Sequence, residues 1–291
     1  MLLLTGATGF TGGYVVELLL DEGYEVTALV RESSDTAKLD RLGVRKVVGD
    51  LRDDASVSQA LDGADTLVNV ASMAGERAAR LVRACRERGV SRAVFFSSTS
   101  IFTALDSPVK PRKIAAEKTI RQSGLDFTVL RPTMIYGTHA DRNMCRLVAY
   151  LARHRVIPVI GDGKSLQQPV HVEDLARAVV LALRVPASIG RFYDLPGAEA
   201  LTYNEVIDTT ARILGRRVTK LHLPLGLCAA ALATARRVTG RSFLSREQAL
   251  RLNEDKAFSI EKARSELGYR ARTFEEGMRS EVDEMRSLGV I

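Results

Sequence analysis

The sequence predicts an α/β fold in which a doubly wound parallel sheet is joined to a smaller, mainly helical C-terminal region. Over the first half of the chain, short apolar runs of strand length alternate with segments of helical periodicity. A glycine-rich turn separates the first apolar run from the first helical segment. Repeats of this kind form parallel sheets that helices cover on both faces.

The elements of this first half follow in order from the spacing of the apolar residues. Six apolar runs predict strands, and four segments between them predict helices. A glycine follows each of these helices, as is typical of a helix C-terminus. We expect strands at Leu2–Leu4, Val26–Val30, Lys46–Val48, Thr66–Val70, Arg92–Ser97 and Phe127–Arg131, helices at Thr11–Glu22, Ala55–Leu61, Glu76–Glu87 and Arg112–Gln122, and caps at Gly23, Gly63, Gly89 and Gly124.

After about Gly137 the pattern changes to helices with scattered short strands. Thr273 and Glu276 have the spacing of a capping box, which predicts the start of the last helix. No repeat or low-complexity linker separates the two parts, so we expect short runs of the second part to return to the sheet. The helices are expected at Asp141–His154, Glu173–Arg184, Thr202–Leu214, Ser259–Leu267 and Thr273–Ser287, and the short runs at Val156–Ile160, Pro169–Val172 and Arg191–Leu195.

The composition is that of an ordinary soluble protein, with 291 residues, 46% hydrophobic and 26% charged. No apolar run reaches the roughly 18 residues that a membrane span requires. The N-terminal leucines lead into the glycine-rich turn and not into a cleavage site. Cys85, Cys145 and Cys228 are widely spaced and lack metal-ligand spacing. We therefore expect a cytoplasmic protein without a metal site.

The net charge of +7 raises the question of an anionic partner. The arginines are spread along the chain and no basic run is interleaved with aromatic residues, so we expect no nucleic-acid binding. One stretch, Pro224–Arg241, is apolar with a basic end. It is typical of a core helix whose arginines face its C-terminal dipole. A helix that contacts a protein partner or a membrane surface is the weaker alternative.

The glycine-rich turn predicts a dinucleotide site. Gly6 allows the tight bend, Gly9 lets the backbone approach a pyrophosphate, and Gly12 allows close packing of the helix. The helix N-terminus adds N–H donors and a partial positive charge. We expect Thr8 and Phe10, which stand between these glycines, to contact the cofactor as well.

The change of pattern after about Gly137 also predicts how the chain is divided. Residues 1–137 are expected to form a dinucleotide-binding Rossmann domain, with returning segments at about residues 156–195. Residues 138–155 and 196–291 are expected to form a smaller region that binds substrate or a partner.

The end of the second strand indicates which cofactor is bound. An NAD site usually places an acidic residue there, about 20 residues beyond the glycines, to bind the ribose 2′-hydroxyl. This chain has Arg31 instead. An arginine can pair with a 2′-phosphate and stack on adenine, so we expect NADP(H) in preference to NAD(H).

Several segments together resemble the short-chain dehydrogenase/reductase superfamily in its extended and atypical branches. The segment Thr5–Gly12 matches the family's TGxxGxxG fingerprint. The resemblance is nearer to NAD-dependent epimerase/dehydratase proteins, and within them to NmrA-like and complex-I accessory-subunit-like members, than to typical short-chain reductases. The other matching segments are Gly49–Asp53, Val70–Ser72, Phe95–Ser98, Leu130–Gly137 and Lys262–Tyr269.

The resemblance implies roles for residues in these segments. Asp50 and Leu51 would lie at the adenine, and Ala71 and Ser72 along the cofactor. Pro132, in the segment after the fifth strand and its helix, would also contact the cofactor.

The resemblance further implies a catalytic Ser, Tyr and Lys, the last two spaced Y-x-x-x-K. Ser98 and Lys113 match the serine and the lysine, and Lys113 would bind the nicotinamide ribose. The tyrosine position holds Val109, which cannot transfer a proton. Tyr136 is the next tyrosine along the chain, but the resemblance makes it a packing residue. His171 likewise falls in a segment that enters a structural helix.

Two functions remain open after this departure from the family pattern. In one, the chain is an atypical oxidoreductase or a nucleotide-sugar epimerase/dehydratase-like enzyme that acts on a carbonyl or hydroxyl substrate. In the other, it binds NADPH without turnover, as a regulator, redox sensor or accessory subunit with a protein partner. A homodimer is compatible with both.

The substrate pocket implied by the resemblance contains few charges. Arg142 and Lys164 could bind a phosphate, whereas the neighbouring methionines favour an apolar ligand. The expected lining is Ser72, Met73, Thr99, Met134, residues 138–143, Gln167 and Gln168.

Overall fold

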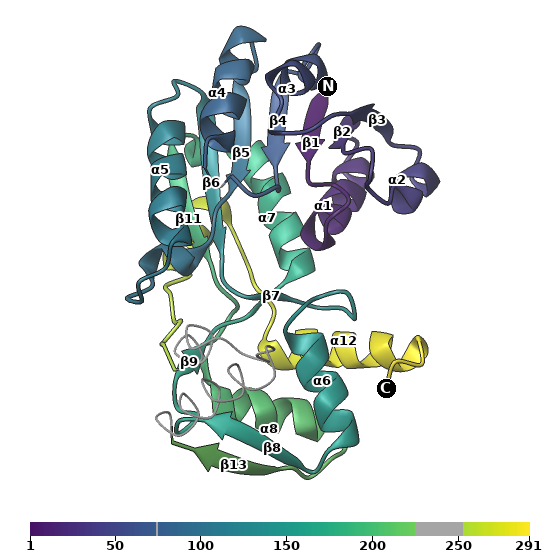
Figure 1. Ribbon diagram of the computed structural model, residues 1–291, viewed down its shortest axis with the longest axis vertical. Helices are drawn as coiled ribbons and strands as arrows, with labels where there is room; N and C mark the ends of the chain where they lie inside the picture. The colour runs from purple at the N-terminus through teal and green to yellow at the C-terminus, as the bar shows by residue number, and fades with distance from the viewer. Residues whose placement is uncertain (74, 225–252) are drawn as a thin grey trace, which may run out of the picture.

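The computed structural model describes residues 1–73, 75–224 and 253–291. The larger part of the molecule is built around one parallel sheet, and a smaller part with its own helices lies beyond the carboxyl ends of the strands (Figure 1). Of the described helices, none is long and apolar enough to cross a membrane.

The main sheet has seven strands in the order β11-β6-β5-β4-β1-β2-β3, and every neighbouring pair is parallel. The strand order reverses between β1 and β4, and ligands bind at such switch points, beyond the carboxyl ends of the strands. The strands are β1 (Leu2–Thr5), β2 (Val26–Val30), β3 (Arg45–Val48), β4 (Thr66–Asn69), β5 (Arg92–Phe96), β6 (Asp126–Pro132) and β11 (Arg191–Leu195).

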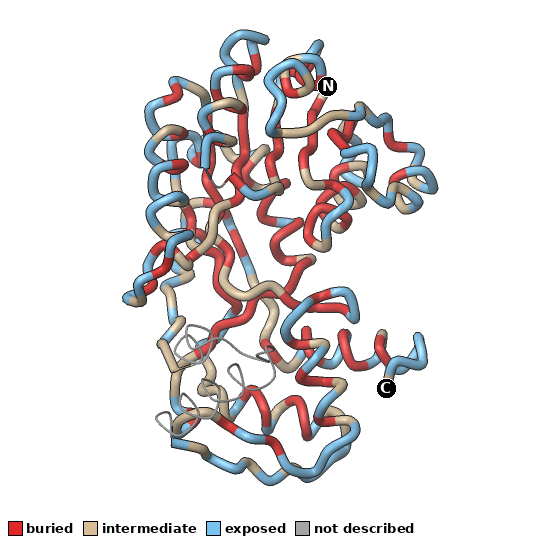
Figure 2. Tube along the Cα trace, in the orientation of Figure 1, coloured by how far each residue is buried: buried red, intermediate tan, exposed pale blue. Residues whose placement is uncertain are grey.

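Helices cover both faces of this sheet because successive strand residues point to opposite sides. Leu2 and Leu4 of β1 join one buried cluster with α1, α2, α7 and α11, whereas Leu3 joins a second cluster with α3, α4 and α5. Figure 2 shows buried residues along these strands. The helices are α1 (Phe10–Asp21), α2 (Ala37–Arg41), α3 (Asp54–Ala60), α4 (Arg77–Glu87), α5 (Val109–Arg121), α7 (Val172–Arg184) and α11 (Glu261–Leu267).

The smaller part has a separate core formed mainly by α6, α8, α12 and β8. Its remaining strands form three two-stranded pairings, β8 with β13, β7 with β10 and β9 with β12. The bounds are α6 (Met144–Arg153), α8 (Tyr203–Ile213), α12 (Phe274–Ser287), β7 (Ile135–Tyr136), β8 (Val156–Ile160), β9 (Leu166–Gln167), β10 (Val170–His171), β12 (Leu201–Thr202) and β13 (Thr219–Leu223), with single 3-10 turns η1 (Thr99–Phe102) and η2 (Pro186–Ser188).

The predicted fold class is confirmed, and the ends of the expected helices and main-sheet strands lie within three residues of their predicted positions. The four expected glycine caps all have positive φ, and the capping box of Thr273 and Glu276 is present. The short helix α2 was not expected, because five residues are too few for a periodic signal.

Two of the three runs expected to return to the sheet do not return. Only β11 does, whereas β8 pairs with β13 and β10 pairs with β7. The exposure of β8 alternates along the strand, so it buries one face, while an inner strand of the main sheet such as β1 is buried throughout. Of the stretch Pro224–Arg241, residues 225–241 lie outside the described residues.

Candidate functional site

A cavity of about 930 Å³ lies at the carboxyl ends of β1, β2 and β4, on the switch point of the sheet. Its opposite wall is the segment after β6, including residues 133–135 and 140–143. Ten of the twelve residues expected at the cofactor line it: Gly6, Thr8, Gly9, Phe10, Gly12, Arg31, Asp50, Leu51, Ala71 and Ser72. Lys113 and Pro132 are not among its lining residues.

The glycine-rich turn leaves no room for side chains at two of its glycines. A Cβ on Gly12 would lie 2.0 Å from the Gly6 carbonyl oxygen, and a Cβ on Gly6, whose φ is +80°, would lie 2.8 Å from the Ala71 nitrogen. Gly9 precedes α1, whose first turn has neither a side-chain cap nor an acidic residue. The uncapped N–H groups and the dipole of α1 therefore favour an anion at this wall, which fits a pyrophosphate.

Asn69 fixes the strand end beside this turn and was missed by the sequence analysis. The Thr5 hydroxyl donates to Asn69 Oδ1 at 2.6 Å, and Asn69 Nδ2 donates to the Ala71 carbonyl at 2.9 Å. Asn69 is 1% exposed. A polar residue at the end of an otherwise apolar strand was the signal that pointed to it.

Two arginines form the end of the cavity at β2. Arg31 lines it and forms no ion pair with any residue of the described ranges. Arg52, which was not predicted, binds Asp50 through two N–H groups, with Nη2 2.8 Å from Oδ2, and these hydrogen bonds lower the pKa of Asp50 to about 2. This end of the cavity therefore carries two guanidinium groups against one ionised carboxylate.

The residues matched to the catalytic motif lie beside α5. Lys113 Nζ donates to Ser100 Oγ at 3.0 Å, and Ser98 Oγ donates to Ser100 Oγ at 3.2 Å. The structure thus brings Ser98 and Lys113 together through Ser100, a residue that was not predicted. Val109 begins α5 and is 42% exposed.

The opposite wall contains a buried pair of carboxyl groups. Asp141 lines the cavity and is 5% exposed, and Glu281 of α12 packs behind it and is 0% exposed. Burial, together with the negative charge of the neighbouring Asp141, raises the pKa of Glu281 to about 10. Glu281 was not predicted, because it lies on a distant helix.

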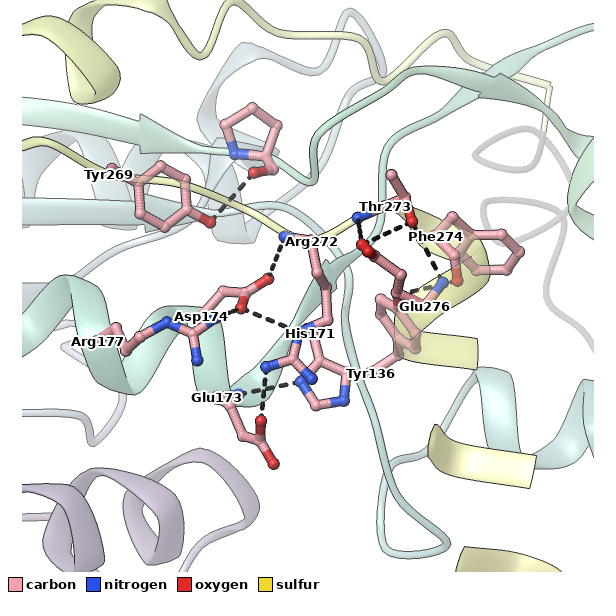
Figure 3. Close-up of polar contacts among 11 residues, drawn as sticks. Tyr136, His171, Glu173, Asp174, Arg177, Tyr269, Arg272, Thr273, Phe274 and Glu276 are labelled. Carbon is pink, nitrogen blue, oxygen red and sulfur yellow. Dashed lines mark hydrogen bonds and ion pairs between the residues drawn. The ribbon is translucent and has the colours of Figure 1, made fainter. Parts of the chain in front are cut away.

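His171 belongs to a polar cluster that joins α7 to the segment before α12 (Figure 3). Its Nδ1 accepts the N–H of Glu173, and its ring packs edge-on against Tyr136. Burial and the Arg272 charge lower the pKa of His171 to about 4. Arg272 in turn binds Asp174 through Nε at 3.1 Å. His171 is therefore a neutral residue of the core, away from the cavity lining.

The fold and the cavity define a dinucleotide-binding protein of the Rossmann type. The chain belongs to the NAD(P)H-binding family, whose model matches residues 6–186. No group of three or more His, Cys, Asp or Glu side chains in the described part of the chain could hold a metal ion.

Relatives with several functions are similar to this chain. An NAD(P)H azoreductase of Xenophilus azovorans is 29% identical over 75% of each chain. Subunit 9 of the NADH dehydrogenase [ubiquinone] 1 alpha subcomplex of Arabidopsis thaliana is 27% identical over 78% of this chain, which spans 61% of that protein. A UDP-glucose 4-epimerase structure from Thermotoga maritima superposes with a TM-score of 0.78 at 19% identity, over 99% of both chains.

These comparisons confirm the resemblance to atypical and epimerase-like short-chain dehydrogenases/reductases. They also confirm a nicotinamide cofactor. The preference for NADP(H) and the roles of the individual site residues remain predictions.

Proposed function

We propose that the protein is an NADPH-dependent oxidoreductase that reduces a conjugated acceptor, such as a quinone-like carbonyl or an azo compound. The observation that carries this proposal is the continuity of the cavity. It extends from Arg31 past the glycine-rich turn to residues 133–135 and Arg142. A dinucleotide bound along this wall would bring its reactive end to the second wall, where a substrate can enter.

The two arginines support NADPH as the cofactor. Arg31 and Arg52 would bind the 2′-phosphate by charge-assisted hydrogen bonds, which are stronger than neutral ones. Asp50 is the carboxylate that lines this end of the cavity, and it is already bound by Arg52. Among the described residues that line this end of the cavity, no carboxylate is therefore free to accept a ribose 2′-hydroxyl, as NAD sites use.

The valine at position 109 favours reduction of a conjugated acceptor over epimerisation. Bound NADPH supplies a hydride equivalent, and the chain must position the acceptor and provide a proton. Epimerisation of a sugar begins by removing a proton from a hydroxyl group, so it requires a strong base. Reduction of a quinone gives a phenol-like oxygen, whose pKa is about 10, so its protonation requires less help. The azoreductase relative acts on a conjugated acceptor of this kind.

Cofactor choice can be tested by binding. Arg31→Ala should raise the Kd for NADPH by about 10- to 100-fold, because a hydrogen bond to a charged group contributes about 1.5–3 kcal/mol. The Kd for NADH should change less than about threefold. Arg45→Ala, an exposed arginine of β3, removes the same charge away from the cavity and should leave both constants unchanged. Equal affinity of the wild type for both cofactors, measured by fluorescence titration, would refute the preference.

Turnover can be tested by following NADPH absorbance with quinones, azo dyes, simple carbonyls and UDP-sugars. Oxidation of NADPH by the conjugated acceptors, and none by UDP-sugars, is expected. Conversion of UDP-sugars without net NADPH oxidation would instead establish an epimerase.

A non-catalytic NADPH-binding accessory protein is the second candidate. Val109 supports it directly, since the usual proton donor is lost, and the complex-I subunit shows similarity over most of this chain. Tight NADPH binding with no turnover of any acceptor would favour this candidate.

A further inference from the structure

The wall opposite the glycine-rich turn holds two buried carboxyl groups, Asp141 and Glu281, and each has one oxygen that accepts backbone N–H groups and one that has no hydrogen-bond partner. Asp141 Oδ1 accepts the N–H groups of Asn143 at 2.7 Å and Cys145 at 3.2 Å. Glu281 Oε2 accepts the N–H of Gly137 at 3.1 Å. The remaining oxygens, Asp141 Oδ2 and Glu281 Oε1, are buried and lack a hydrogen-bond partner.

A single proton shared by the two carboxyl groups would give both unpaired oxygens a hydrogen-bond partner. Two ionised carboxylates cannot hydrogen bond to each other, and unpaired buried charges are costly. With one proton, each of the two oxygens gains a partner. The pair then carries a single negative charge, as other carboxyl pairs that share a site do.

The surroundings keep this proton in place at neutral pH. Glu284, on the same helix, adds negative charge, while the Cys145 thiol of α6 and the Tyr136 phenol of β7 stay neutral because burial raises the pKa of both. The pKa of about 10 for Glu281 is close to the ordinary pKa of tyrosine. Acid strength of this order is matched to a phenol-like product oxygen.

We infer that the Asp141–Glu281 pair is the proton donor of this protein, in place of the tyrosine that Val109 replaces. Asp141 is the member that lines the cavity, and Glu281 holds the proton behind it. Because Asp141 Oδ2 is buried, the Asp141 carboxyl must turn towards the cavity to deliver the proton. This inference rests on the proposed reductase function.

The reaction step balances. A quinone takes the hydride equivalent of NADPH at one carbonyl oxygen, and NADPH is oxidised to NADP⁺. The C=O π bonds break as the ring becomes aromatic, and the other oxygen is left with the negative charge. This second oxygen takes the shared proton from Asp141. The pair is left doubly ionised, which is unfavourable in a buried site, and it regains a proton from solvent after the product leaves.

Glu281→Gln tests the inference with a matched control. The amide keeps the size of the side chain, can still accept the Gly137 N–H and can donate to Asp141, so folding should survive, but it cannot transfer a proton. Asp283→Asn makes the same change at an exposed position of the same helix. We expect kcat for a quinone to fall about 100-fold in Glu281→Gln, within the range for loss of a general acid, with the Kd for NADPH unchanged. Asp283→Asn should match the wild type.

A second measurement does not depend on turnover. Infrared spectra at pH 7 should show the C=O band of a protonated carboxylic acid that shifts in D₂O, present in wild type and Asp283→Asn but absent in Glu281→Gln. If Glu281→Gln does not fold, Asp141→Asn serves in both measurements with the same expected losses.

The outcomes separate this inference from the proposed function. A wild type that turns over while Glu281→Gln retains its kcat, or a wild type without the infrared band, overturns the inference and leaves the reductase standing. A wild type that reduces none of the acceptors refutes the reductase and the donor role together.

Discussion

The two walls of the cofactor cavity differ in the sequence separation of the residues that form them. The first wall is the β1-α1-β2 unit, the turn after β3 and the end of β4, all within the first 72 residues. The second wall consists of residues 133–143, which are held in place by α12. An example is the hydrogen bond from the Gly137 N–H to Glu281, 144 residues further along the chain. The first wall relies on backbone groups and on the absence of side chains, whereas the second relies on the ionisation of buried side chains.

The largest effect is expected from a substitution in the glycine-rich turn of the first wall. Gly12→Val should abolish measurable NADPH binding and lower the free energy of unfolding by about 3 kcal/mol, because overpacking of this size forces the backbone apart. The new Cβ would meet the Gly6 carbonyl at 2.0 Å. Isothermal titration and urea unfolding measure the two quantities.

The neighbouring glycine provides the control. A Cβ on Gly13 would meet only the flexible Lys38 side chain, with Nζ nearest at 3.2 Å. Gly13→Ala should therefore bind NADPH as the wild type does and fold with equal or greater stability, since alanine is favoured in helices. If both substitutions had the same effect, the close contact at Gly12 would not explain it.

The same difference between the two walls determines which site residues could be predicted from the sequence. Gly6, Gly9 and Gly12 were identified from spacing alone, because their function depends on backbone contacts within one βαβ unit. Ser98 and Lys113 were found from a family pattern, but Ser100, which joins them, was not, since a serine after a strand carries no signal of its own.

Glu281 and Asn69 could not be assigned from the sequence for different reasons. Glu281 looks like one of several acidic residues on an amphipathic helix, and only tertiary packing buries it. Asn69 interrupts an apolar strand, which indicates a role but not a partner. β8 was expected in the main sheet because an apolar run does not specify which strand it will pair with.

Two buried ionisable groups, His171 of the core and Glu281 behind the second wall, should affect the pH dependence of stability. His171 has its pKa lowered from 6.5 to about 4, so the unfolded chain binds more protons than the folded one between these values. Its contribution is complete above pH 6.5 and is lost as the pH falls. We expect the free energy of unfolding to drop by about 2 kcal/mol from pH 7 to pH 5 through this residue.

Glu281 acts in the opposite direction. Its pKa is raised from 4.5 to about 10, so its contribution is complete below pH 4.5 and is lost as the pH rises towards 10. Between pH 4.5 and 6.5 the contributions of the two residues oppose each other, whereas above pH 6.5 only that of Glu281 changes. Urea unfolding should therefore show that Glu281→Gln removes the loss of stability above pH 6.5 and exposes the acid slope of His171. His171→Asn should leave only the steady rise in stability towards acid pH that Glu281 causes. Exposed His154 is the control, and His154→Gln should leave the profile unchanged. Unaltered slopes in both core variants would contradict the assignment.

The smallest expected effect comes from restoring the missing tyrosine of the catalytic motif on α5, which lies outside the cavity lining. Positions 109 and 113 lie one turn apart on the same face of α5, and Val109 is 42% exposed, so an aromatic ring can replace it without disturbing the core. If Lys113 retains the ribose-binding role, Val109→Tyr adds a phenol next to a cation that lowers its pKa. We expect kcat for a simple ketone to rise about tenfold, a modest part of the gain that a general acid can give. A quinone, whose product oxygen needs less help, should show little change. Val109→Phe supplies the same ring without the hydroxyl, so equal rates for the two variants would show that Lys113 no longer supports proton transfer at this position.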